Sequence, residues 1–513
     1  MNAPNTPGTR ASASDSRAIV PASRTAWLCA GAVMLLFLTL TIAESLAQCP
    51  WMDEGMFADV ALRYRNFGHL GSSVLDPYGY QELPGVHRYT YWQFPLYLVA
   101  LGTWFRLLPG TVVWMRIFSV AWGCVFVISW FVLARALSRN DSLALLVASV
   151  IALDYSLLVA ACNGRMDMMC AALGLAGLAS YFWLRNSNWL LAVVLAASFG
   201  AASLLTHPMG LVMNIAIAAM IVLDWRQVRW SGVLATSIPY LVGLAFCLYY
   251  IYQAPELFLA QSRAASQYRV SGMGLVLHNI MNDWSHRYLL YYYGVYTGIN
   301  KLKIATLIFP VIGAVGLLAD KDIRLRHLGK RLLLLLVIAY VGVAAIDNQK
   351  FGNYLVFSVP VAQACAAVWL YAQWQKGYKR RLLAGSLLAM SVAATLVGTI
   401  YKIQNDEYDN LYYPAVAAIR NALPCGGLLM GGSELGFALG FGPPLVDDRY
   451  LGFFSGMVPD VFVINEFYGP MRSSPRLNGA WEFSRATLRD RYHLVFRNKA
   501  YSVYVHNGVA PRS

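Results

Sequence analysis

Apolar stretches close to membrane length recur along most of the chain, and they constrain its fold more than any other feature. A helix needs about 20 apolar residues to cross the hydrocarbon core of a bilayer. Backbone groups inside lipid must be satisfied internally, so stretches of this kind form helices. Only 13% of the residues are charged, against about 25% in soluble domains. We therefore expect a polytopic helical membrane protein with spans at 26–47, 112–134, 143–161, 168–184, 189–206, 209–223, 231–251, 304–319, 332–346, 354–372 and 382–400.

One further apolar segment, 94–108, decides the topology. It contains Pro95 and Arg106, and it would add a twelfth crossing if it spanned the membrane. Basic loops such as 321–331 and 379–381 would then face outward, against the positive-inside rule. We therefore predict that this segment lies in the interface and that eleven spans leave the N-terminus inside and the C-terminus outside. The expected parts are a cytoplasmic tail at 1–25, a membrane domain at 26–401 with outer loops 49–111 and 252–303, and an outer domain at 402–513.

The C-terminal part differs in kind from the rest. Apolar runs beyond residue 404 are short and alternate with Gly, Pro and charged residues. The pattern predicts a helix at 413–421 and strands at 428–430, 461–464, 493–496 and 501–505, and so a small α/β domain. Its Gly-rich stretch 431–436 is only loosely similar to a phosphate loop. Because it lacks the Lys-Ser/Thr pair of a P-loop, a turn is the favoured interpretation.

Ionisable and polar residues gather where the predicted spans meet the outer face. Each one alone is more often an ordinary helix-end residue. Together they place acids and bases at one depth on one face, as a reaction centre at the membrane surface requires. An acid can take a proton from a hydroxyl nucleophile, and Arg or Lys can hold a phosphate. The group comprises Asp53, Glu54, Arg116, Arg165, Asp167, His207, Lys350, Asn353 and Tyr354.

Other ligand classes find little support in the residues. His278 and His286 lack a third metal ligand at helical spacing, so we expect no metal and no cofactor. The net charge of +14 is explained by basic cytoplasmic loops, and no basic tract with interleaved aromatics indicates nucleic acid.

At these positions residues 26–400 resemble the GT-C glycosyltransferases that use a polyprenyl-phosphate sugar, with lipid A aminoarabinose transferases and protein O-mannosyltransferases as the nearest families. The matching motifs are Asp53-Glu54 after the first span and Asp167 beside Arg165 after the third. A third motif combines Lys350 and Tyr354 with Pro360.

The chain also departs from the pattern of these families. Aminoarabinose transferases carry Lys-Pro-Pro-Leu where this chain has Gln93-Phe94-Pro95-Leu96, and Arg88 is a possible stand-in for the missing lysine. A Lys-Gly pair often joins the fifth and sixth spans, where this chain has His207-Pro208. Both changes concern expected phosphate contacts.

The resemblance implies an inverting glycosyltransferase on the outer face of a bacterial inner membrane. A sugar would pass from a lipid-linked donor to a lipid, glycan or protein acceptor. Asp53 would act as general base, while Glu54 and Asp167 would orient the acceptor or the sugar. The implied donor phosphate contacts are Arg165, Lys350, Arg88 and Arg116, and the implied positioning residues are His207, Tyr354 and Asn353.

A different class, a transporter or flippase of a lipid-linked substrate, is the alternative. It predicts charges at mid-membrane and repeated halves with broken helices in matching positions. The sequence shows no internal repeat, and the charges cluster at one face. A scaffold without catalytic activity would not explain the acid pair or the long outer loops.

Overall fold

The computed structural model describes residues 23–75, 83–224, 230–269, 273–290, 303–320, 323–347, 350, 352–448, 450–466 and 478–508. The predicted cytoplasmic tail lies almost wholly outside these residues, and so does part of the basic loop 321–331.

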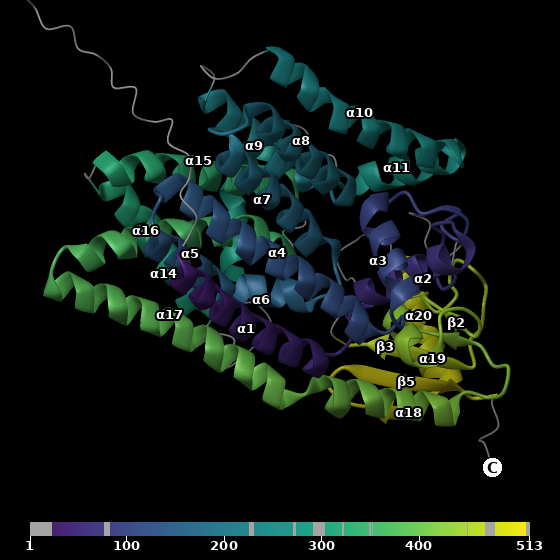
Figure 1. The fold of residues 1–513 in the computed structure, drawn as a ribbon. Helices are drawn as coiled ribbons and strands as arrows, with labels where there is room; N and C mark the ends of the chain where they lie inside the picture. The colour runs from purple at the N-terminus through teal and green to yellow at the C-terminus, as the bar shows by residue number, and fades with distance from the viewer. Residues whose placement is uncertain are drawn as a thin grey trace, which may run out of the picture.

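Helices cover all eleven predicted membrane stretches, and one of the stretches is broken. Eight helices of the described chain are long and apolar enough to span a membrane, and α5 with α6 forms a further candidate that bends by 59°. The helix α9 and residues 306–319 of α14 are shorter apolar helices. The prediction of a polytopic helical membrane protein is confirmed, whereas the orientation stays a prediction. The bundle (Figure 1) contains α1 (Arg24–Ala47), α4 (Val112–Ser138), α5 (Asp141–Ala152), α6 (Tyr155–Cys162), α7 (Met166–Leu184), α8 (Trp189–Thr206), α9 (Gly210–Leu223), α10 (Trp230–Tyr252), α14 (Lys303–Ala319), α15 (Ile323–Ile346), α16 (Val359–Gln375) and α17 (Tyr378–Asn405).

Small residues place α7 at the centre of the bundle. A Cβ added at Gly174 would lie 2.4 Å from the Met213 Cβ of α9, so the two helices approach too closely for a larger side chain. Close approach through small residues drives helix packing in membranes, where the hydrophobic effect is absent. Most of α7 is buried, whereas α10 and α17 expose most of their apolar side chains. The N-terminal end of α7 therefore belongs to a closely packed helix.

The segment 49–111, which is predicted to lie outside and is called the first outer segment, contains two helices, α2 (Met52–Phe67) and α3 (Pro95–Leu107). The helix α3 has 13 residues, so it is about 20 Å long and too short to cross a bilayer core of about 30 Å. Its length supports the interfacial interpretation of segment 94–108. The second outer segment forms α11 (Pro255–Arg269), α12 (Met273–Asp283) and the π-helix η2 (Trp284–Leu290).

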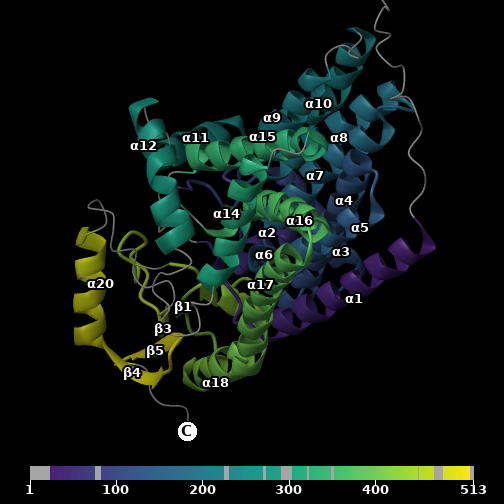
Figure 2. The same ribbon diagram turned by 90° about the vertical axis from the view of Figure 1, so that its left-hand side faces the viewer.

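The C-terminal α/β domain is built on one five-stranded sheet of order β2-β1-β3-β5-β4. The strand β1 pairs in parallel with β2 and β3, whereas β5 pairs antiparallel with β3 and β4. The four predicted strands and the helix α18 are present, and β2 and α20 were not predicted. The elements are α18 (Tyr413–Ala422), β1 (Leu429–Met430), β2 (Leu445–Val446), β3 (Val461–Asn465), α20 (Asn478–Arg491), β4 (Tyr492–Arg497) and β5 (Tyr501–His506). Figure 2 shows this domain at one end of the bundle, with α20 on its outer side.

The Gly-rich stretch 431–436 joins the C-terminal domain to α2. It contains the short helix η6 (Ser433–Leu435), whose residues are buried. The Ser433 hydroxyl donates a hydrogen bond to the Met52 carbonyl at 2.9 Å. A Cβ added at Gly55 would lie 2.3 Å from the backbone nitrogen of Glu434. The stretch is therefore a contact surface for α2.

We expect Gly55→Ala to destabilise the protein, because the added methyl group meets backbone atoms that cannot rotate away. Overpacking of this kind costs about 1–3 kcal/mol, which a lower thermal unfolding midpoint would reveal. Gly31→Ala is the matched control, since a Cβ added there meets nothing within 4 Å. Equal midpoints for the two variants would contradict this account of the contact.

The predicted orientation can be tested with thiol labelling of intact cells. Cys425 is exposed in the C-terminal domain, so a membrane-impermeant maleimide should label it from outside. A Ser187→Cys variant, in a Cys425→Ser background, should react only after permeabilisation because the exposed α7–α8 connection is predicted to face inward. Labelling of position 187 in intact cells would show that the orientation is the opposite of the predicted one.

Candidate active site

The acid pair forms the first turn of α2. A helix N-terminus favours negative charge, and the Glu54 carboxylate accepts a hydrogen bond from the Trp51 backbone nitrogen at 2.8 Å. Neighbouring helical residues point about 100° apart. The side chains of Asp53 and Glu54 therefore reach different partners.

Glu54 is fully buried and is paired with Arg116 of α4. The Arg116 guanidinium donates from Nε to Oε1 at 2.8 Å and from Nη2 to Oε2 at 2.7 Å. The backbone nitrogen of Gly164 also donates to Oε1 at 2.8 Å. With the bond from Trp51, the Glu54 carboxylate accepts four hydrogen bonds.

Arg116 uses all five of its N–H groups on protein acceptors. Two bonds go to Glu54, and three go to the carbonyl oxygens of Ser45, Gln48 and Cys49 at 2.6–3.0 Å. The pair therefore joins α2 and α4 to the end of α1. Both side chains are buried and their hydrogen-bonding atoms are occupied, so neither Glu54 nor Arg116 offers a free contact to a substrate.

Arg165 links the other two acids. Its guanidinium forms ion pairs with Asp53, through Nη1, and with Asp167, from Nε at 2.8 Å. Arg165 is the N-cap of α7, and Asp167 lies in the first turn of that helix. The Asp53 side chain is 28% exposed and that of Asp167 is 3% exposed. Asp53 is thus the accessible member of a group with two negative charges and one positive charge.

Asp167 faces His207 at the α8–α9 connection. The Oδ1 atom of Asp167 is buried and has no hydrogen-bond partner among the described residues, and His207 Nε2 lies 3.9 Å away. His207 Nδ1 accepts a hydrogen bond from the Met209 backbone nitrogen at 3.1 Å. This bond assigns the ring proton of a neutral imidazole to Nε2, so the proton faces Asp167 across a gap longer than a hydrogen bond.

Tyr354 extends this row of side chains. Its ring centroid lies 5.3 Å from that of His207, and it belongs to the 3-10 helix η4 (Gly352–Phe357). The neighbouring residue Asn353 is also buried. The guanidinium carbon of Arg287 lies 5.9 Å from the Tyr354 ring centroid.

Lys350 belongs to a second, buried charge cluster. Its ammonium group lies 2.9 Å from Asp283 Oδ1 and donates to the carbonyl oxygens of Asn279 and Ala344 at 3.0 and 3.1 Å. Arg287 pairs with the same Asp283 and with Asp347. All three donors of Lys350 are therefore occupied. The spacing of Asp283 and Arg287, four residues apart, was the available sequence signal for this cluster.

Asp59 is a further buried acid that the sequence reasoning missed. Its carboxylate, on α2, accepts hydrogen bonds from the hydroxyls of Ser72 and Ser73 and from the Ser73 backbone nitrogen. Burial raises the pKa of Asp59, although these hydrogen bonds oppose the shift. The contacts fasten the chain after α2 back onto that helix, so they position the helix.

Comparisons with known proteins match the chain through its structure. No protein-family model and no curated protein sequence matches it. The structure of ArnT from Cupriavidus metallidurans bound to undecaprenyl phosphate is similar, with a TM-score of 0.57 and 14% identity, covering 96% of this chain and 100% of that one. The oligosaccharyltransferase of Archaeoglobus fulgidus in its apo form has a TM-score of 0.53 and 12% identity, covering 94% and 75%.

This chain has the GT-C fold. The predicted fold class, a GT-C membrane protein with a small C-terminal α/β domain, is confirmed. Identities of 12–14% establish the fold alone, so the chemistry must come from this chain's residues.

Within this fold all the predicted site residues except Arg88 fall into three groups. Asp53, Arg165, Asp167, His207 and Tyr354 form one continuous row, next to which Asn353 is buried. Glu54 with Arg116, and Lys350 with its cluster, form the other two groups, which are internally paired.

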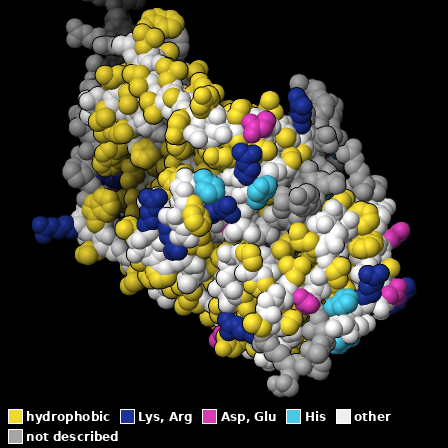
Figure 3. Space-filling view, turned by 90° about the vertical axis from the view of Figure 1, so that its right-hand side faces the viewer, with side chains coloured by type: hydrophobic (Ala, Val, Ile, Leu, Met, Phe, Trp, Pro, Cys, Tyr) yellow, Lys and Arg dark blue, Asp and Glu magenta, His cyan; other side chains and the backbone are white. Residues whose placement is uncertain are grey.

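Arg88 stands apart from all three groups. It is exposed on the first outer segment, and its side chain has no hydrogen-bond or ion-pair partner in the described chain. Figure 3 shows basic side chains gathered near the middle of the face that it views, beside a mostly apolar region.

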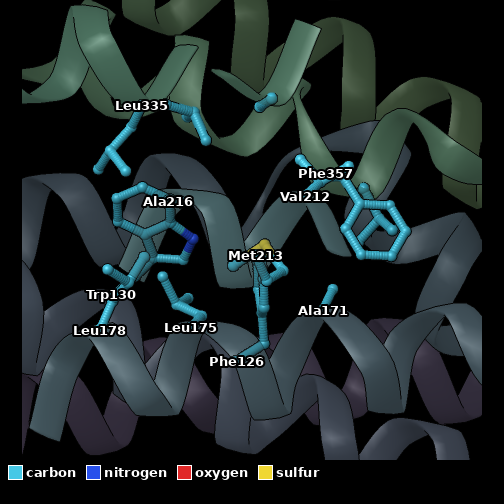
Figure 4. A pocket seen from close by; sticks show the side chains of 13 residues that line it. Phe126, Trp130, Ala171, Leu175, Leu178, Val212, Met213, Ala216, Leu335 and Phe357 are labelled. Carbon is cyan, nitrogen blue, oxygen red and sulfur yellow. The ribbon is translucent and has the colours of Figure 1, made fainter. Parts of the chain in front are cut away.

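The GT-C bundle also encloses an apolar cavity of about 30 Å³. Figure 4 shows side chains such as Trp130, Leu175, Met213 and Phe357 around it. Phe357 follows Tyr354 by three residues in η4, so one lining residue of the cavity is a single helical turn away from the row. Its apolar lining offers no acid or base.

Proposed function

We propose that this chain is an inverting glycosyltransferase that uses a polyprenyl-phosphate sugar on the outer face of the bacterial inner membrane. The acceptor would be a hydroxyl of a lipid, a glycan or a protein. The fold shared with an undecaprenyl-phosphate-bound ArnT and with an oligosaccharyltransferase supports this class. The accessibility of Asp53 carries the proposal, because Glu54 and Asp167 are buried and Asp53 is not.

In the proposed reaction, Asp53 takes the proton of the acceptor hydroxyl as its oxygen attacks the anomeric carbon. The bond from that carbon to the phosphate oxygen breaks, and the electron pair leaves with the polyprenyl phosphate. A single displacement inverts the anomeric centre and needs one base. Arg165 holds Asp53 and Asp167 in fixed positions, and Asp167 with His207 orients the reacting groups. Tyr354 and Asn353 border them.

The leaving phosphate needs a cation, and Arg88 is the strongest candidate. Arg116 and Lys350 have all their donors occupied. Arg165 would have to share its charge with two carboxylates. Arg88 is exposed on the outer segment that precedes α3.

We expect Arg88→Gln to weaken binding of undecaprenyl phosphate by about tenfold or more. A hydrogen bond to a charged group contributes about 1.5–3 kcal/mol. Titration of the purified variants with this lipid in detergent measures the effect. Arg106→Gln, which removes another exposed arginine of the same outer segment, should bind as the wild type does. If the wild type and both variants bound the lipid with equal affinity, the phosphate contact would be assigned to Arg165 or Lys350 instead.

The function as a whole is tested by intact-mass analysis of lipids and glycans from a strain that lacks the protein. One species should lose the mass of a single sugar, and the wild-type gene should restore it. The Asp53→Asn gene should not. Restoration by that variant, with no sugar-transfer activity in the purified protein, would favour the transporter or flippase alternative.

A further inference from the structure

Gln93 is a buried side chain whose polarity the proposed reaction leaves unexplained. It is 3% exposed, and neither Nε2 nor Oε1 has a hydrogen-bond partner among the described residues. The same holds for the Thr90 hydroxyl and for Trp92 Nε1. Most buried polar atoms in native proteins are paired, and an unpaired one is costly. Four such atoms within four residues indicate a missing ligand.

The backbone of this segment is held by hydrogen bonds, so a small shift of the chain cannot bring Gln93 to a hydrogen-bond partner. Gln261 of α11 donates to the carbonyl oxygens of Pro84 and Tyr89 at 2.9 and 2.8 Å, and it accepts from the Tyr91 nitrogen at 2.7 Å. The hydroxyl of Tyr250 donates to the Thr90 carbonyl at 2.7 Å. The second outer segment thus fixes the first.

The segment also borders the row that contains Asp53. The Trp92 ring centroid lies 6.1 Å from that of Phe57. Phe57 follows Asp53 by four residues on α2, which places the two on one face of the helix. The guanidinium carbon of Arg165 lies 5.9 Å from the same ring. Trp92 therefore packs against the side chain that Arg165 also contacts, about one helical turn from Asp53, and Gln93 is the next residue along the chain.

We propose that Gln93 and Trp92 bind hydroxyl groups of the transferred sugar and that Gln93 is a specificity-determining residue. This inference rests on the proposed glycosyltransferase function. A primary amide offers both donors and an acceptor, and an indole offers a donor; a sugar hydroxyl is both donor and acceptor and complements them. Because neither side chain carries a charge, the pair suits a hydroxylated, uncharged sugar better than the phosphate, which charged donors bind more strongly.

The test uses a water-soluble short-chain prenyl phosphate and its glucosyl and mannosyl esters, with purified full-length protein. Wild type should bind at least one ester more tightly than the free phosphate. Gln93→Met removes both polar atoms at similar volume, and Trp92→Phe removes the indole donor. Each variant should weaken ester binding about tenfold and leave affinity for the free phosphate within about twofold.

The ligand-free stability of Gln93→Met separates a binding role from a structural one. Loss of two unpaired buried polar atoms should raise the thermal unfolding midpoint by about 2 °C or more. Gln253→Leu, at an exposed glutamine near the end of α10, should alter none of these values.

Four outcomes would overturn the inference. An equal loss of affinity for ester and free phosphate would make Gln93 a phosphate contact. If both variants bound the ester and the free phosphate as the wild type does, these atoms would not contact the sugar donor. A lower unfolding midpoint for Gln93→Met would make Gln93 a structural residue. Wild-type protein that binds none of the compounds would instead overturn the proposed function, and the inference with it.

Discussion

Replacement of Asp53 by Asn is expected to slow sugar transfer by a factor of roughly 10²–10⁴, the usual effect of losing a general base. The amide keeps the shape of the side chain and removes its capacity to accept the hydroxyl proton. Initial rates of sugar transfer at saturating donor measure the loss. Binding of undecaprenyl phosphate should change little, because the carboxylate acts on the acceptor.

Two further variants make this result decisive. Asp409→Asn changes an exposed acid of the predicted outer region and should transfer sugar at the wild-type rate. Asp167→Asn should retain partial activity, because Asp167 orients the reacting groups and Asp53 still takes the proton. If Asp53→Asn kept near-normal turnover and Asp167→Asn abolished it, Asp167 would be the base.

Replacement of Glu54 by Gln is expected to destabilise the fold by about 3–5 kcal/mol, the usual cost of removing one partner of a buried ion pair. Arg116 would keep its charge in a site without a compensating carboxylate. Thermal unfolding followed by tryptophan fluorescence should show a much lower midpoint. Arg116→Met should have a similar effect.

A double variant isolates the coupling between the two residues. Glu54→Gln with Arg116→Met should be less destabilised than the sum of the single changes, since no uncompensated charge remains. Asp490→Asn, in an exposed ion pair with Arg489, should leave the midpoint unchanged. If the Glu54→Gln protein were stable but had lost sugar transfer, Glu54 would have a catalytic role.

The sequence alone allows much of the fold to be predicted, because long apolar runs force helices in lipid. The 59° bend between α5 and α6 was not predicted, although Asp154, the N-cap of α6, interrupts the apolar run at that point. The strand β2 was missed because two residues show no alternation, and its parallel pairing with β1 is a long-range contact.

The candidate site shows a similar division. Order along the chain and topology are enough to gather the acids and bases at one face. They cannot distinguish Asp53 from Glu54, which are adjacent and chemically alike. Only the packed structure shows that Glu54 meets Arg116, 62 residues further along the chain, and that Asp53 meets Arg165. The unpaired atoms of Gln93 likewise appear only when all neighbouring donors and acceptors are in place.

The contact between η6 and α2 has a consequence for biosynthesis. The ribosome makes α2 early and η6 near the end, and chains emerge from their N-terminus. More than 370 further residues (Gly55 to Ser433) must therefore be synthesised before the helix that carries Asp53 can pack against η6. A chain terminated after α17 would contain every membrane stretch and still lack the surface against which α2 packs. Premature stop codons anywhere before residue 433 should therefore inactivate the protein.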